Sequence, residues 1–220
     1  MAKRFSSKAL KSPDQFFKAM LKFVGYLKSN VKAYLVFSAI VVVITLGYVV
    51  INHISDKREE NARTALFKMN ANIKVMGSSN LGDHIKIVEA ELDKLGSTTA
   101  GMEARYMLAE LYYSKGDWDK AITQYNYVLD NTDGLLQELS IMGAAYSLEN
   151  KGDINGALKK FETLKDLTPY LYKAVSLLGI GRCYKKLGDN GKALSAYESV
   201  IISYPDTDYA RMASIAKVGL

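Results

Sequence analysis

The chain has 220 residues, with 29 Lys and Arg against 23 Asp and Glu and a formal net charge of +6. Its single cysteine excludes an intrachain disulfide, and only three prolines together with abundant Ala, Leu, Lys and Tyr favour an all-helical fold. The excess charge lies at the N-terminal end: residues 1–32 carry eight Lys or Arg and one Asp, whereas residues 56–220 carry 21 basic and 22 acidic residues. The net positive charge therefore does not indicate a nucleic-acid-binding domain.

Residues 1–32 form a basic leader. Ser12, Pro13 and Gln15 have the pattern of a helix N-cap, first helical position and capping-box partner, so a helix is predicted over residues 13–31. The apolar residues of this helix recur on one stripe, and the lysines lie largely elsewhere: Phe16, Met20, Phe23, Val24, Leu27 and Val31. Such an amphipathic helix is expected to lie on anionic lipid headgroups. Docking on a cytoplasmic protein is the alternative.

Residues 33–55 contain no charged residue. About 20 apolar residues are needed for a helix to cross a bilayer, so this segment is predicted to be a transmembrane helix that contacts lipid over residues 33–54. A cleaved signal peptide would have a shorter apolar core and a cleavage site, and a buried helix of a soluble protein would show a polar face. The basic leader predicts a cytoplasmic N-terminus and places residues 56–220 on the other side of the membrane.

Two short helical patterns follow this predicted anchor. The first has apolar residues at spacings of four and three, and Gly77 to Asn80 are expected to end it: Ala62, Leu66, Met69, Ile73 and Met76. The second is expected to open at Asp83 and to close at Gly96, with its apolar residues facing one way: Ile85, Val88, Leu92 and Leu95. We interpret residues 56–96 as a degenerate helical pair.

From residue 102 onward the sequence repeats with a period of 36. Residues 112–125, 148–161 and 184–197 align without gaps, and four kinds of residue recur in register: Gly116, Gly152 and Gly188; Asp117, Asp153 and Asp189; Ala121, Ala157 and Ala193; Tyr125, Phe161 and Tyr197. Gly-Asp is expected to end one helix in a left-handed turn and to cap the next. The alanine permits two helices to cross closely, and the aromatic residue fills the space against the neighbouring pair. Pairs of this kind stack into a solenoid.

These repeats resemble the tetratricopeptide repeat (TPR) family, over residues 102–205 and with three repeats two residues longer than usual. The resemblance implies a solenoid domain over residues 56–220 that ends in a closing helix over residues 206–217. The complete layout is similar to bacterial YfgM-like proteins, which have a cytoplasmic N-terminus, one inner-membrane helix and a periplasmic TPR domain associated with the Sec translocon. The fold class expected is thus all-α: an amphipathic helix, a single transmembrane helix and a solenoid of helical hairpins.

The resemblance also implies a binding groove, because the first helix of each TPR pair lines the concave surface. The matching positions are Glu103, Tyr106, Glu110 and Tyr113 in the first repeat, Leu139, Met142, Tyr146 and Glu149 in the second, and Val175, Leu178, Arg182 and Lys185 in the third. This groove would be acidic and aromatic at one end, apolar in the middle and basic at the other, which suits a polypeptide of mixed polarity. The alternative is that its tyrosines only fill space between helices.

The sequence offers no signal for catalysis or for a cofactor. His53 and His84 are the only histidines and are expected at the surface, and no cluster has the spacing of a metal site or of a phosphate-binding loop. The leading hypothesis is therefore a non-enzymatic adaptor that is anchored in the bacterial inner membrane, faces the periplasm, binds proteins and belongs with translocation or folding machinery. A structural subunit of a large envelope complex is the alternative function, and the mitochondrial inner membrane is the alternative location.

Overall fold

The computed structural model describes residues 15–76, 81–167 and 170–220. It divides into two compact units, Met1–Lys57 and Arg58–Leu220, and each is described by itself. The described residues are helical, in ten helices without a strand, which confirms the all-α fold. The predicted helix start at Ser12 and Pro13 lies outside the described residues.

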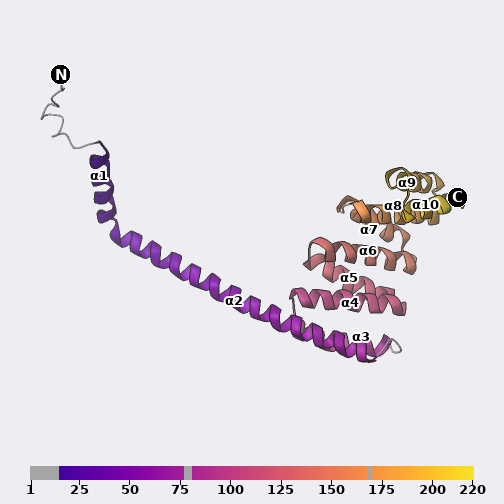
Figure 1. Cartoon of the computed structure of the whole chain (residues 1–220), viewed down its shortest axis with the longest axis horizontal. Coiled ribbons are helices and arrows are strands. Elements are labelled where there is room, and N and C mark those ends of the chain that lie inside the picture. Colours follow the sequence, from indigo (N-terminus) through magenta and orange to yellow (C-terminus); the bar gives the residue numbers. More distant parts are fainter. Residues whose placement is uncertain (1–14, 77–80, 168–169) are drawn as a thin grey trace, which may run out of the picture. The chain divides into compact units, whose positions relative to one another are not determined.

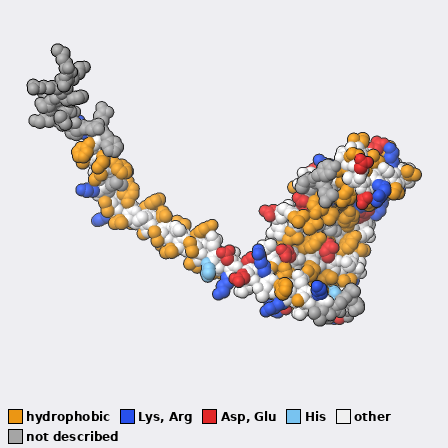
Figure 2. Space-filling model, in the orientation of Figure 1, with side chains coloured by type: hydrophobic (Ala, Val, Ile, Leu, Met, Phe, Trp, Pro, Cys, Tyr) orange, Lys and Arg blue, Asp and Glu red, His pale blue; other side chains and the backbone are white. Residues whose placement is uncertain are grey.

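The first unit contains α1 (Gln15–Ser29) and the beginning of α2 (Val31–Met76). Every described residue from Val31 to Lys57 is exposed, and hydrophobic side chains are frequent on the surface of this stretch (Figure 2). The hydroxyls of Ser38 and Thr45 donate to the carbonyls of Leu35 and Val41, at 2.9 and 2.7 Å, so these polar groups are satisfied within the helix. Among the described helices, α2 alone is long and apolar enough to cross a membrane by length and composition.

The second unit is a stack of helices that follow one another in chain order (Figure 1). Beyond the end of α2 these are α3 (Leu81–Leu95), α4 (Thr99–Lys115), α5 (Trp118–Asn131), α6 (Gly134–Lys151), α7 (Ile154–Leu167), α8 (Tyr170–Lys186), α9 (Asn190–Ser203) and α10 (Asp208–Val218). Helices α4 to α9 form three hairpins, and α10 closes the stack against α9. The solenoid of helical hairpins is therefore confirmed.

The first pair of the stack consists of the end of α2 and α3. Ala62, Leu66 and Met69 are buried against the α3 stripe, as their spacing predicted. Two details differ from the sequence analysis. Helix α3 begins at Leu81, two residues before the predicted start at Asp83. His84 is 7% exposed and not a surface residue, because in this helix it is one turn from Val88 and shares the buried face.

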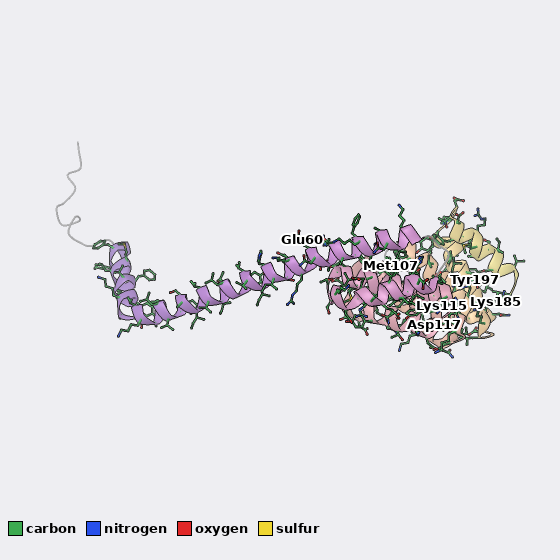
Figure 3. The ribbon with its side chains drawn as sticks, turned by 90° about the horizontal axis from the view of Figure 1, so that it is seen from below. Glu60, Met107, Lys115, Asp117, Lys185 and Tyr197 are labelled. Carbon is green, nitrogen blue, oxygen red and sulfur yellow. The ribbon has the colours of Figure 1, made fainter. Side chains whose placement is uncertain are left out.

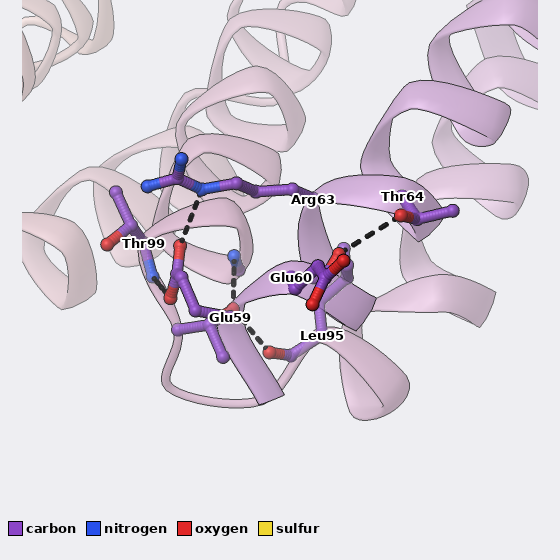
Figure 4. Close-up of polar contacts among 8 residues, drawn as sticks. Glu59, Glu60, Arg63, Thr64, Leu95 and Thr99 are labelled. Carbon is purple, nitrogen blue, oxygen red and sulfur yellow. Dashed lines mark hydrogen bonds and ion pairs between the residues drawn. The ribbon is translucent and has the colours of Figure 1, made fainter. Parts of the chain in front are cut away.

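Glu59 joins α2 to the first turn of α4. Its carboxylate accepts a hydrogen bond from the backbone N–H of Thr99 at 3.0 Å and contacts the side chain of Arg63 at 3.4 Å (Figure 4). Burial opposes ionisation of Glu59, but the hydrogen bonds from Thr99, Arg63 and Ala100 outweigh it and lower the pKa of this carboxyl group. A carboxylate at a helix N-terminus satisfies free N–H groups and is favoured by the helix dipole.

The turns inside the hairpins follow the Gly-Asp pattern. Gly116 has φ 82°, Gly152 has φ 94° and Gly188 has φ 79°, all in the left-handed region that favours glycine. Asp117, which follows Gly116 at the turn marked by Lys115 and Asp117 in Figure 3, accepts from the backbone N–H of Lys120. Its counterparts Asp153 and Asp189 accept from the N–H groups of Gly156 and Lys192 at 2.9 and 3.1 Å. The sequence motif is thus a C-cap followed by an N-cap.

The recurring aromatic residues are the largest fully buried side chains of the stack, and Tyr197 is marked in Figure 3. A Cβ atom on Gly143 of α6 would lie less than 3.0 Å from three ring carbons of Tyr125 on α5. One on Gly179 of α8 would meet Phe161 of α7 in the same way. Tyr125 and Phe161 therefore each pack against a glycine of the next hairpin, which explains how the aromatic position joins neighbouring pairs. Tyr197 instead packs against Gly181 of its own hairpin.

Candidate functional site: a tyrosine-lined pocket between the first helices

The face formed by α4 and α6 holds a pocket of about 190 Å³. It brings together six of the twelve residues predicted for the groove and two that were not predicted for it. The lining residues are Tyr106, Glu110, Tyr113, Tyr125, Leu139, Met142, Gly143 and Tyr146, and we call this set the tyrosine pocket. Tyr125 comes from α5, and the others come from the two first helices. The pocket therefore lies where neighbouring hairpins meet.

Glu110 is the only carboxylate in the lining of the tyrosine pocket, and it remains exposed. The hydroxyl of Tyr125 donates a hydrogen bond to Oε1 of Glu110. Burial, followed by this hydrogen bond and the negative charge of Glu110, raises the pKa of Tyr125. Burial and the same carboxylate also raise the pKa of Tyr106. Both phenols therefore stay neutral at physiological pH, and the hydroxyl of Tyr125 is a donor to Glu110.

Neighbouring contacts hold the tyrosine rings in place. The rings of Tyr106 and Tyr125 meet edge to face, with centroids 5.8 Å apart. Tyr113 meets Trp118 in the same arrangement at 5.1 Å, and its hydroxyl accepts a hydrogen bond from Nδ2 of Asn150 at 2.9 Å. These contacts link α4, α5 and α6, so the shape of the pocket is set by the hairpins themselves.

The junction of α6 and α8 has a different chemistry. Glu149, predicted for the groove, has a side chain only 7% exposed and is paired within the chain. Arg182 donates to both of its oxygens, from Nε at 3.2 Å and Nη2 at 2.9 Å, and Lys186 lies 3.0 Å away. Burial opposes ionisation of Glu149, but these two cations outweigh it and lower the pKa of the carboxyl group. The Arg182 guanidinium also lies 5.3 Å from the centroid of the Tyr146 ring.

The other predicted groove residues lie outside the tyrosine pocket. Glu103 and Lys185 are exposed on α4 and α8, Val175 is partly exposed, and Leu178 is buried in the core at 5% exposure. Tyr125 and Gly143 were not predicted to line the pocket, and Lys186 was not predicted to pair with Glu149. The repeat alignment had already marked Tyr125 as a space-filling residue. Its hydroxyl, which donates a hydrogen bond to Glu110 on the preceding helix, was not anticipated.

The arrangement of side chains in the tyrosine pocket is suited to binding. Exposed carboxylate oxygens, neutral phenol rings and two apolar side chains can hold a side chain of a polypeptide. In the part of the chain that the structure describes, no group of three or more His, Cys, Asp or Glu could hold a metal ion. Burial raises the pKa of the Cys183 thiol to about 11, so this cysteine is an inert core residue at neutral pH.

Comparisons with known proteins agree with this geometry. No curated protein matches the chain. The solved structures of similar fold include two described as a putative kinesin light chain of Podosopora anserina with nearly identical TPR-like repeats, one of them a variant with a single glutamine-to-methionine substitution. Their TM-scores are 0.56 and 0.57, with 12% identity over 74% of this chain and 83% of theirs. The profile of the tetratricopeptide repeat-like domain matches residues 25–212, and the chain therefore belongs to this family.

Proposed function

We propose that this protein is a membrane-anchored adaptor that binds a polypeptide through the groove formed by the first helices of its hairpins. The observation that carries this proposal is the tyrosine pocket, in which six of the predicted groove residues surround one opening. Repeats of this family generally serve as non-enzymatic scaffolds for protein–protein interaction, and the family match indicates no catalytic class. The protein acts by stoichiometric binding.

The anchor sets where this binding takes place. In this proposal residues 1–32 are cytoplasmic, residues 33–55 cross the bilayer and residues 56–220 lie on the far side. The support is the uncovered apolar surface of α2 together with the excess of Lys and Arg before it. Helix α1 exposes Phe17, Met20, Leu21 and Phe23, which suits a helix lying in the cytoplasmic headgroup layer. An anchor confines the search for partners to the membrane surface and raises the effective concentration.

The YfgM-like layout extends the proposal to a location and a process. A cytoplasmic basic leader, one anchor and a TPR-like solenoid suit a bacterial inner-membrane protein whose solenoid is periplasmic. The partner would be an emerging chain or a component of the translocation and folding machinery near the Sec translocon, and the activity would be chaperone-like. The support for this step is the similarity in layout and the charge distribution.

Photo-crosslinking in native membranes tests the groove. A photoreactive amino acid placed at Leu139, in the tyrosine pocket, should capture a defined protein partner. The matched control is Thr163, an exposed residue on a second helix, α7. Capture from Leu139 and not from Thr163 is the expected result. Equal capture from both positions, or no protein captured from Leu139, would refute binding through the groove.

One observation favours a second candidate function, a permanent subunit of an envelope complex. Helix α10 exposes Met212, Ile215 and Val218 at 52%, 70% and 90%, whereas the end of a solenoid usually presents a polar face. A permanent neighbour could cover this stripe. Purification in mild detergent separates the two candidates: a subunit is recovered in fixed ratio with the same neighbours, and an adaptor is recovered with variable ones.

A further inference from the structure

The carboxylate of Glu110 lies among the aromatic rings of the tyrosine pocket and is not paired with a cation among the described residues. Among the ion pairs of the described residues, none includes Glu110. The hydroxyl of Tyr125 donates a hydrogen bond to Glu110, and the Tyr106 phenol is close enough for the carboxylate to raise its pKa, but neither group supplies a positive charge. An ionised carboxylate among phenol rings attracts a cationic side chain through its charge, and the rings add a cation–π interaction where the cation meets a ring face.

At the next junction of the stack, between α6 and α8, a carboxylate beside aromatic rings is paired with a cation of the chain itself. There the guanidinium of Arg182 meets the carboxylate of Glu149 and lies 5.3 and 5.6 Å from the ring centroids of Tyr146 and Phe161. Phe161 is the counterpart of Tyr125 one repeat later, at the period of 36. Both junctions therefore combine one carboxylate with the recurring ring of the second helix. Only the later junction has its own cation among the residues that the structure describes.

We propose that the tyrosine pocket binds a Lys or Arg side chain of the polypeptide held in the groove, with Glu110 as the ionic partner and the surrounding tyrosines as an aromatic cage. This inference rests on the proposed function, because the side chain belongs to the bound partner. The expected partner carries a basic residue that enters the pocket, and apolar residues beside it that contact Leu139 and Met142. At the next junction two cations, Arg182 and Lys186, share the single carboxylate of Glu149, and the surplus positive charge favours a partner that also carries an acidic residue.

The test uses the whole chain in neutral detergent with the methionine methyl groups labelled with carbon-13. Met142 lines the pocket, and its signal is assigned by its loss in Met142→Leu. The probe is N-α-acetyl-lysine methylamide, and the control probe is its N-ε-acetylated form, which is similar in shape but has no charge. The expected result is a saturable shift of the Met142 signal with the charged probe and roughly tenfold weaker binding of the neutral one.

Two variants locate the effect on one carboxylate. Glu110→Gln keeps the shape of the side chain and should lower affinity for the charged probe roughly tenfold, while affinity for the neutral probe hardly changes. Asp130→Asn removes the same charge from an exposed position on α5, outside the pocket and outside the predicted groove, and should leave both affinities unchanged. The inference is overturned if the Met142 signal does not respond to the charged probe, if both probes bind equally, or if both variants have the same effect.

The crosslinking experiment with Leu139 separates this inference from the proposed function. If Leu139 captures a partner but the charged probe has no advantage, the groove binds proteins and the cationic pocket is wrong. If the charged probe binds through Glu110 but no partner is captured, the pocket chemistry stands and the adaptor function fails.

Discussion

The substitution Gly143→Ala tests how the hairpins of the stack fit together. Gly143 lies inside α6, where alanine is intrinsically the better helix former by about 1 kcal/mol. A Cβ at this position would, however, lie less than 3.0 Å from three carbons of the Tyr125 ring. The sign of the change in stability therefore depends on whether this ring can move.

Tyr125 has little freedom to move. Its side chain is 1% exposed, its ring meets that of Tyr106, and its hydroxyl is bonded to Glu110. Overpacking of such a core costs about 1–3 kcal/mol, which exceeds the gain in helix propensity. We expect Gly143→Ala to lower the free energy of unfolding by about 1–2 kcal/mol, or to lower the Tm of a domain of this size by roughly 2–8 °C.

Urea unfolding followed by the emission of Trp118 measures this change. Trp118 is the only tryptophan, lies at the start of α5 and contacts Tyr113, so it reports on the hairpins and not on the anchor. The matched control is Gly191→Ala in α9, where a new Cβ has its nearest neighbour at 3.7 Å. This variant should be neutral or more stable by up to about 1 kcal/mol. Equal stabilisation by both substitutions would refute the packing of Tyr125 against Gly143.

Three further predictions concern the same domain. Ala157→Leu, at a fully buried helix crossing, should cost about 1–3 kcal/mol, and an unchanged Tm would contradict the placement of that alanine. The cations beside Glu149 hold its pKa below the ordinary 4.5, so this ion pair stabilises the fold above that pH and the contribution is lost as pH falls through the lowered value. Glu149→Gln should thus lose about 2 kcal/mol at pH 7, and a deficit in Tm that does not shrink on acidification would contradict the linkage. Removal of residues 1–55 should leave a soluble, helical monomer by gel filtration and circular dichroism, whereas an insoluble product would indicate that the exposed stripe on α10 needs a partner.

The parts of the fold predicted from the sequence are those that depend on local backbone chemistry. A left-handed turn at Gly116 and a cap at Asp117 follow from two adjacent residues, and the period of 36 repeats them along the chain. The burial of Ala121 and Tyr125 follows from helical spacing alone. Each of these features requires little knowledge of distant residues.

The parts that were missed depend on which helices become neighbours and on their register. The hydroxyl of Tyr125 contacts Glu110, 15 residues earlier, because α5 packs on α4 in one particular register along the helix axes. Glu149 on α6 is paired with Arg182, which lies on α8 of the next hairpin, so its burial depends on the packing of two hairpins. His84 was expected at the surface because the start of α3 was placed two residues too late. Spacing along one helix contains none of this information.

The proposed location and the proposed class of partner both require that the membrane separates the solenoid from the basic leader. A thiol or epitope tag after Leu220, probed in intact cells with a reagent that does not cross the inner membrane, measures this directly. We predict that the tag reacts from outside that membrane, and that a matched tag before residue 12 does not. A C-terminal tag that reacts only from the cytosol would contradict the proposed topology, the proposed location and the class of partner.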